Sequence, residues 1–169
     1  MTAVLIALLV AVQFVTAPLG QFVTGSLVNL ILIVSAMTIG LSSGLTIAAV
    51  SPVVAATAGV GPVVQLVPFI IVGNVTLVLA WGLICKLKYA RTGVKRAAAA
   101  VTAAVCKSIA LYFGVVRIAI PYILSLPEQK AAQMSIMFSI PQLITALLGG
   151  AAAVMILPAI EKARTARAL

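Results

Sequence analysis

The sequence alternates between long apolar stretches and short groups of Gly, Pro and polar residues. A helix needs about 20 apolar residues to cross the roughly 30 Å hydrocarbon core of a bilayer. Clustered Gly and Pro interrupt helices, as at Pro18–Gly20, Gly40–Gly44 and Gly59–Pro62. The second and third apolar stretches are close to the minimum length, which leaves five or seven helices as alternatives to six. The pattern predicts six membrane-spanning helices, at Thr2–Thr16, Ser26–Ile39, Leu45–Ala58, Gln65–Leu87, Arg96–Ile120 and Lys130–Ile160.

The composition supports a membrane protein. Of 169 residues, 64% are hydrophobic and 8% are charged, and the mean hydropathy is +1.31. A soluble domain carries about 25% charged residues, so this chain cannot cover a surface that faces water. We expect an all-α, polytopic bundle in which residues 1–169 form a single transmembrane domain.

Several classes of function lack the residues they need. The chain has no histidine, and its only acidic residues are Glu128 and Glu161. We therefore expect no enzyme activity, no cofactor and no metal site. No stretch matches the nucleotide-binding Walker A pattern, so energy from ATP would have to come from a partner chain. Cys85 and Cys106 stand alone in apolar stretches, where such cysteines are usually packing residues.

The net charge of +9 indicates how the helices are oriented. Cations that flank membrane spans prefer the cytoplasmic side and anionic lipid, which explains this charge better than nucleic-acid binding. Two predicted spans separate the two cationic clusters, so both fall on one side, and we predict that the N- and C-termini are cytoplasmic. The loops at Thr16–Gly25, Ala58–Val64 and Pro121–Gln129 then face outside. The clusters are Lys86, Lys88, Arg91, Lys95 and Arg96, and Lys162, Arg164 and Arg167.

Three alanines recur at every fourth position of the first predicted helix, at Ala3, Ala7 and Ala11. This spacing places them on one face, with about 40° of drift per step. In lipid, small residues at this spacing let two helix backbones approach closely. The face is a candidate docking surface for a partner. The alternatives are packing within the chain's own bundle and chance, since an alanine-rich sequence produces such a pattern by itself.

Lys107 is the most informative single residue. It lies eleven residues beyond Arg96, which is about 16 Å along a helix axis and near the middle of the apolar layer. A charged side chain there costs at least about 2.5–3.5 kcal/mol on insertion scales, and no acid lies at comparable depth. We predict that Lys107 faces an internal cavity, with Gly114 leaving room beside it, and meets an anionic group of a ligand. The alternative is that its stem reaches towards the headgroups.

Further polar residues lie inside or beside the predicted spans. Asn29 and Asn74 either contact a ligand or bond a neighbouring helix. For Arg117, near the outer end of its helix, headgroup contact is as good an explanation as a second ligand contact. Pro141 should loosen the sixth helix and free a carbonyl. In the same helix, Ser135, Ser139 and Gln142 follow i, i+4, i+7 spacing and form a polar stripe on one face. We predict that one cavity, open to the outside, is lined by Lys107, Asn74, Gln142 and the loop residues Gln21 and Thr24.

These residues suggest a family. The chain resembles a substrate-binding S component of an energy-coupling factor (ECF) vitamin transporter, in its six hydrophobic helices and the Ala3, Ala7 and Ala11 face. It is especially similar to a group of S components with uncharacterised substrates, in the stretches Thr24–Asn29, Pro68–Asn74 and Pro141–Gly150.

The resemblance implies both a ligand and partners. An S component of this family binds a vitamin or related micronutrient from outside and docks through its alanine face on a transmembrane coupling subunit. Two ABC ATPases drive that subunit, and the S component topples in the membrane to release its cargo. On this basis Ala3, Ala7 and Ala11 would be the docking face. Asn74, Lys107 and Gln142 would be candidate ligand contacts.

Two other functions remain possible on the sequence alone. A secondary transporter or channel would work without partners, although such proteins usually carry acids or histidines in their ion paths, and no predicted span here has them. A structural membrane subunit would bind no ligand and would use its polar midplane residues to hold helices together.

Overall fold

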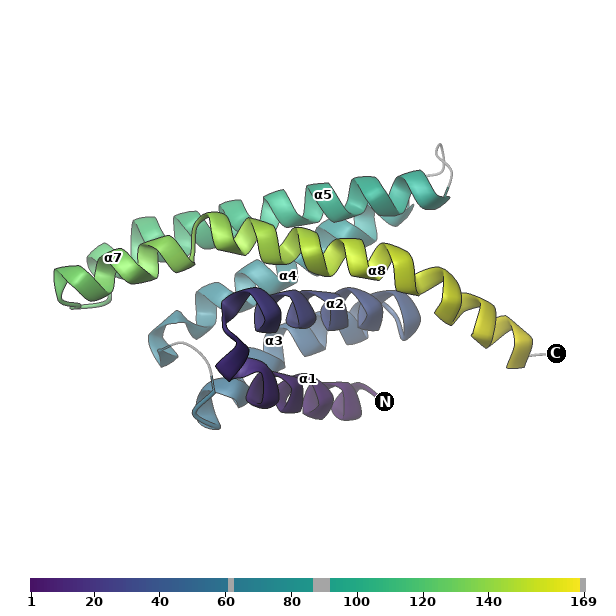
Figure 1. Ribbon diagram of the computed structural model, residues 1–169, viewed down its shortest axis with the longest axis horizontal. Helices are drawn as coiled ribbons and strands as arrows, with labels where there is room; N and C mark the ends of the chain where they lie inside the picture. The colour runs from purple at the N-terminus through teal and green to yellow at the C-terminus, as the bar shows by residue number, and fades with distance from the viewer. Residues whose placement is uncertain (61–62, 87–91, 168–169) are drawn as a thin grey trace.

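The computed structural model describes residues 1–60, 63–86 and 92–167, and within them the chain is helical and contains no strand (Figure 1). Five helical segments of this part of the chain are long and apolar enough to cross a membrane, and α3 is a shorter apolar helix. The predicted all-α membrane bundle of six helices is confirmed. Its elements are α1 (Thr2–Thr16), η1 (Ala17–Leu19), α2 (Gln21–Thr38), α3 (Leu41–Thr57), η2 (Val64–Leu66), α4 (Val67–Lys86), α5 (Thr92–Leu111), η3 (Tyr112–Ala119), α6 (Ile120–Tyr122), α7 (Glu128–Met137) and α8 (Ile140–Arg167).

The breaks between the first three helices are shorter than predicted. Gly20 and Gly40 each have a positive φ, 86° and 132°, and the next helix begins at the following residue. A single glycine in this conformation is enough to redirect the chain. Gln21 and Thr24 therefore lie in the first turns of α2 and not in a loop. Gly44, which was expected in a turn, lies inside α3, where Ala36 leaves no room for a Cβ atom.

The fifth and sixth predicted helices are each divided. The fifth changes from α-helix to π-helix at Tyr112. The sixth breaks at Phe138 and Ser139, between α7 and α8. Pro141 has no N–H to donate to the carbonyl four residues earlier, which belongs to Met137, so its predicted loosening of the helix and the freed carbonyl are both present.

Some predicted positions lie outside the described residues. These are Gly61 and Pro62 in the loop before the fourth helix, Leu87 at the end of that helix, and Lys88 and Arg91 in the basic segment.

The α1–α2 link and the start of α7 lie at one end of the molecule, and the N- and C-termini lie at the other (Figure 1). Helix α5 packs between α4 and α8, and α2 packs against α8 and α4. Helix α3 lies against α4 and α2, and α1 lies against α3 and α2. Helix α7 extends beyond the ends of α1–α4 (Figure 1).

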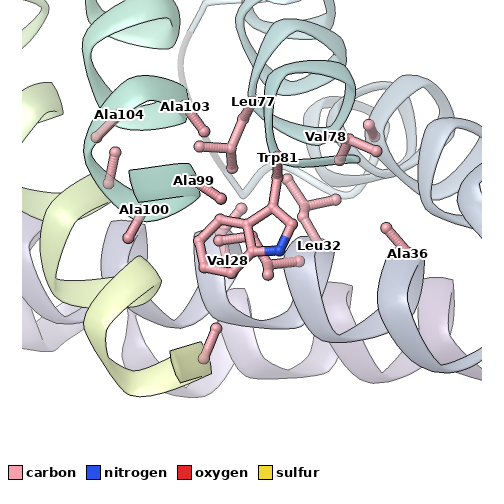
Figure 2. Close-up of a cluster of buried hydrophobic side chains, with 14 of the residues drawn as sticks. Val28, Leu32, Ala36, Leu77, Val78, Trp81, Ala99, Ala100, Ala103 and Ala104 are labelled. Atoms are coloured by element: carbon pink, nitrogen blue, oxygen red, sulfur yellow. The ribbon is translucent and has the colours of Figure 1, made fainter. Parts of the chain in front are cut away.

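A close-packed apolar region, which we call the Trp81 core, fills the half of the bundle nearer the termini. Figure 2 shows the Trp81 indole between α2 residues and the alanines of α5. Trp81 is fully buried, and small α5 side chains make room for its ring. The labelled members of this core are Val28, Leu32, Ala36, Leu77, Val78, Trp81, Ala99, Ala100, Ala103 and Ala104.

Candidate functional site: a cavity with a buried lysine at its floor

Lys107 lies inside the bundle and is held by two amides. Its Nζ atom donates to Oδ1 of Asn29 at 2.6 Å and to Oδ1 of Asn74 at 2.8 Å. The three residues come from α5, α2 and α4, and their exposed fractions are 4%, 1% and 2%. We call these three residues the cavity floor. Among the described residues no acid pairs with Lys107, since the ion pair found there joins Arg96 to Glu161.

The hydrogen bonds fix which atoms the floor offers to a ligand. A lysine amine in its charged form has three donors and no acceptor, so both amides must turn their oxygens towards it. The free sides of the two asparagines are then their NH₂ groups. The Nδ2 atom of Asn29 is buried and has no partner among the described residues. The floor therefore presents hydrogen-bond donors, which suits an acceptor group.

A cavity of about 440 Å³ lies above this floor. Its size is within the usual range of small-molecule sites, about 300–1,000 Å³. The cavity runs from the floor towards the end of the bundle that carries the α1–α2 link, and its walls are mainly apolar. Its lining consists of Gln13, Ala17, Gly20, Gln21, Thr24, Gly25, Val28, Asn29, Pro52, Ala55, Val60, Val67, Ile70, Asn74, Lys107, Leu111, Met137, Phe138 and Gln142.

The break between α7 and α8 shapes one wall of this cavity. Gln142 is buried, and its Nε2 atom lies 3.4 Å from the carbonyl oxygen of Met137, the carbonyl that Pro141 frees. Met137 and Phe138 also line the cavity. The interruption of the helix thus places a side-chain amide and two apolar residues at the site.

Near the mouth, the Thr24 hydroxyl donates to the carbonyl oxygen of Thr16 at 2.8 Å. This bond ties the first turn of α2 to the end of α1. Because the hydroxyl proton is used there, Thr24 can only accept a hydrogen bond from a ligand.

The structure brings six of the seven predicted contact residues to one cavity. Lys107, Asn29, Asn74 and Gln142 are buried around it, and Gln21 and Thr24 line it nearer the mouth. Arg117 is not brought there, since it is exposed on η3 and does not line the cavity.

The expectation that Gly114 leaves room beside Lys107 is wrong. A Cβ atom on Gly114 would lie 2.8 Å from the ring of Phe69, and Gly114 is not part of the cavity lining. The π-helical turns that begin at Tyr112 shift the phase of the helix between Lys107 and Gly114, so the α-helical spacing used for the prediction does not apply.

Sequence reasoning missed Gln13, which lines the cavity from α1. Its Oε1 atom is buried and unpartnered within the described chain. A signal was available, because Gln13 is an amide inside an apolar span. It lies two residues, or about 200° of rotation, from Ala11, and therefore on the other side of α1 from the alanine face.

The predicted docking alanines lie on the outside of the bundle. Ala3, Ala7 and Ala11 are all exposed, whereas Leu9 of the same helix is fully buried. The face that the alanines form is therefore not used for packing within the described part of this chain, which excludes internal packing as the explanation for their spacing and leaves partner docking and chance.

Comparison with known proteins identifies a family. The family model described as "ECF transporter, substrate-specific component" matches residues 2–161. No curated protein and no solved structure matches the chain.

Proposed function

The chain belongs to the family of ECF transporter substrate-specific components, and from this premise we propose that it captures a small anionic micronutrient, such as a vitamin, from outside the cell. The chain is a multi-pass membrane protein and a transporter component, and the family is not one of enzymes. Membership implies a small-molecule substrate, a membrane coupling subunit and ATPases as partners.

The observation that carries the proposal is Lys107 at the cavity floor. Its amine is buried at the base of a cavity of ligand size, and two asparagines bond to it without neutralising its charge. A group with negative charge, brought by the ligand, would supply the missing counter-charge. Asn29, Asn74, Gln142, Gln21 and Thr24 would be further contacts, because all five line the same cavity.

The Trp81 core argues against the rival function of a channel. Trp81 lies seven residues beyond Asn74 on α4, about 10 Å further towards the termini. The indole, Leu32, Ala99 and Ala103 have no exposed surface in this core. A filled core below a cavity blocks a continuous path through the bundle. It therefore favours a binding subunit, which relies on partners to move its cargo, and disfavours a pore that works alone.

Two measurements test the proposed capture function together. Native mass spectrometry of the gently purified chain should show a bound small molecule. In a transport assay, this molecule should accumulate in vesicles only when the coupling subunit, the ATPases and ATP are present. Uptake by this chain alone, without ATP or partners, would support the rival transporter or channel. Failure to find any bound or binding small molecule would support a structural subunit.

We further propose that Ala3, Ala7 and Ala11 dock on the coupling subunit, and that both termini are cytoplasmic. The exposed alanine face supports the first part. The cationic residues Lys162 and Arg164 near the C-terminus, and the position of both termini at the same end of the molecule (Figure 1), support the second. Ala7→Trp should prevent co-purification with the coupling subunit and leave ligand binding unchanged, whereas Val72→Trp, at an exposed site on α4, serves as the matched control. Normal assembly of the Ala7→Trp chain would overturn the docking proposal. Cysteine labelling near the C-terminus, in cells, tests the orientation.

A further inference from the structure

The chemistry of the cavity floor narrows the substrate to one class, and this inference rests on the proposed function. We propose that the substrate carries a single carboxylate, which is seated on Lys107, Asn29 and Asn74.

The floor offers hydrogen-bond donors to the substrate. Lys107 donates to the amide oxygens of both asparagines, at 2.6 and 2.8 Å, and this orientation leaves the NH₂ groups of Asn29 and Asn74 as donors beside the lysine amine. The third N–H of the lysine amine is also free of partners among the described residues. A carboxylate has only acceptor sites, on two oxygens, and it matches such a floor. An ammonium group on the substrate would place its donors and positive charge against the donors and positive charge of the floor. A carboxamide or an alcohol would leave the lysine charge without a counter-ion.

The cavity lining offers the substrate the charge of a single lysine. All residues that line the cavity are described by the structure, and Lys107 is the one with an ionisable side chain. Arg117 is exposed outside the cavity and adds no second positive charge there. A phosphate monoester carries about −1.5 to −2 at pH 7, so up to about one negative charge would remain uncompensated in a buried site. A carboxylate carries −1 and balances Lys107.

The cavity walls above the floor would surround the rest of the substrate. Above the floor the walls are formed by apolar residues such as Val28, Ile70 and Leu111. The other polar residues of the lining, including Gln13, Gln21 and Gln142, are neutral. These surroundings suit an uncharged body with neutral hydrogen-bonding groups and do not suit a second ionised group.

The experiment compares four probes that share one body and differ in the head group. These are 6-acetamidohexanoate, 6-acetamidohexanamide, 5-acetamidopentyl phosphate and N-(5-aminopentyl)acetamide. Thermal stabilisation of the purified full-length chain in lipid nanodiscs is measured against the concentration of each probe at pH 7. The proposal expects the carboxylate to bind at least ten times more tightly than the other three. Equal or tighter binding of the phosphate, amide or amine would overturn the carboxylate assignment and leave the receptor function standing.

A charge-neutral variant separates the role of Lys107 from general stability. Lys107→Gln keeps a donor at the floor but removes the charge, so the preference for the carboxylate over the amide should disappear. Lys130→Gln, at an exposed lysine of α7, should keep that preference. An unchanged preference in Lys107→Gln would contradict the proposal.

The natural ligand gives an independent test, in case the probes are too simple to bind. A molecule that co-purifies with the chain should form one methyl ester with diazomethane and contain no phosphate. A co-purifying ligand without a carboxylate would overturn the inference. If no ligand co-purifies and no probe binds, the proposed function itself fails along with it.

Discussion

The cavity floor and the Trp81 core are built by the same three helices, and they differ in what those helices bury. On α2, α4 and α5 the floor has Asn29, Asn74 and Lys107. One to two turns further towards the termini, the same helices contribute Leu32, Trp81 and the alanines of α5 to the core. One end of the bundle is therefore hollow and hydrogen-bonded, whereas the other is filled by dispersion contacts.

The difference indicates that affinity and stability are located in separate places. The floor buries polar groups that do not all have partners, which lowers stability but provides contacts for a ligand. The core also buries one polar atom without a partner among the described residues, Nε1 of Trp81, but apolar side chains otherwise fill it and join α2, α4 and α5 below the cavity. Substitutions in the core should therefore lower stability more than affinity, and substitutions in the floor should lower affinity more than stability.

Trp81→Ala should cause the largest loss of stability. Removing a fully buried indole leaves a cavity between α2, α4 and α5, and Trp→Ala changes of this kind cost about 3–5 kcal/mol. The thermal unfolding midpoint, followed by circular dichroism, should fall, and Trp81→Phe should fall less. Ligand affinity, measured well below the unfolding range, should change by less than about threefold, because Trp81 does not line the cavity and meets it only through Val28, which belongs to both regions. A much larger loss of affinity would show that the core and the cavity floor are coupled and would contradict the separation of affinity from stability.

Lys107→Met should have the opposite pattern. It removes a charged hydrogen-bond donor from the floor, an interaction of about 1.5–3 kcal/mol, so affinity for the cognate ligand should fall about 10- to 100-fold. The thermal midpoint without ligand should remain close to that of the wild type, because a buried charge is removed at the same time as two hydrogen bonds. Isothermal titration and thermal unfolding measure the two effects. Unchanged affinity would remove the anion argument.

Gly149→Ala should affect both regions, because α8 meets α2 at this glycine. A Cβ atom there would lie 2.6 Å from the carbonyl oxygen of Ser26 and 2.7 Å from Cβ of Asn29. Overpacking of this kind costs about 1–3 kcal/mol, and moving α2 displaces an asparagine of the floor. Both the thermal midpoint and the affinity should fall. Gly93→Ala, where a Cβ atom meets nothing within 4 Å, is the control; equal effects of the two variants would refute the role of the close contact.

Gln13→Leu should have the smallest effect. The Oε1 atom of Gln13 has no partner in the described residues, so its loss should not lower stability. If this atom accepts a hydrogen bond from the ligand, affinity should fall by the value of one neutral bond, about 0.5–1.5 kcal/mol, or roughly three- to tenfold. Gln133→Leu, at an exposed position of α7, is the control for these titrations. Equal affinity of the Gln13→Leu chain and the wild type would exclude Gln13 from the contacts.

Much of the fold could be predicted from the sequence because lipid imposes a simple rule. Apolar length sets the number of spans, and clusters of Gly and Pro mark where they end. α1 begins and ends as predicted, at Thr2 and Thr16. The start of α2 differs from the prediction because polar residues such as Gln21 and Thr24 are typical of loops, whereas here a short 3-10 turn, Ala17–Leu19, and Gly20 complete the link before them.

The site was less accessible to sequence reasoning. The depth of Lys107 and the lack of nearby acids indicated a buried cation facing a cavity. Its two asparagine partners could not be assigned, since no sequence pattern shows which helices face each other. Gly114 was misplaced because the π-helical segment has a different periodicity from an α-helix. Gln13 could not be assigned because it is a lone amide on α1, with no spacing that connects it to the other polar residues of the site.

The central claim is that the substrate's acidic group lies on the floor formed by Lys107, Asn29 and Asn74. A structure of the chain determined with its co-purified ligand tests this claim most directly. The account predicts a ligand carboxylate oxygen within hydrogen-bond distance, about 2.7–3.2 Å, of the Lys107 Nζ atom, with the uncharged body against Val28, Ile70 and Leu111. A ligand bound elsewhere, or one that presents a basic or apolar group to the floor, would contradict the account.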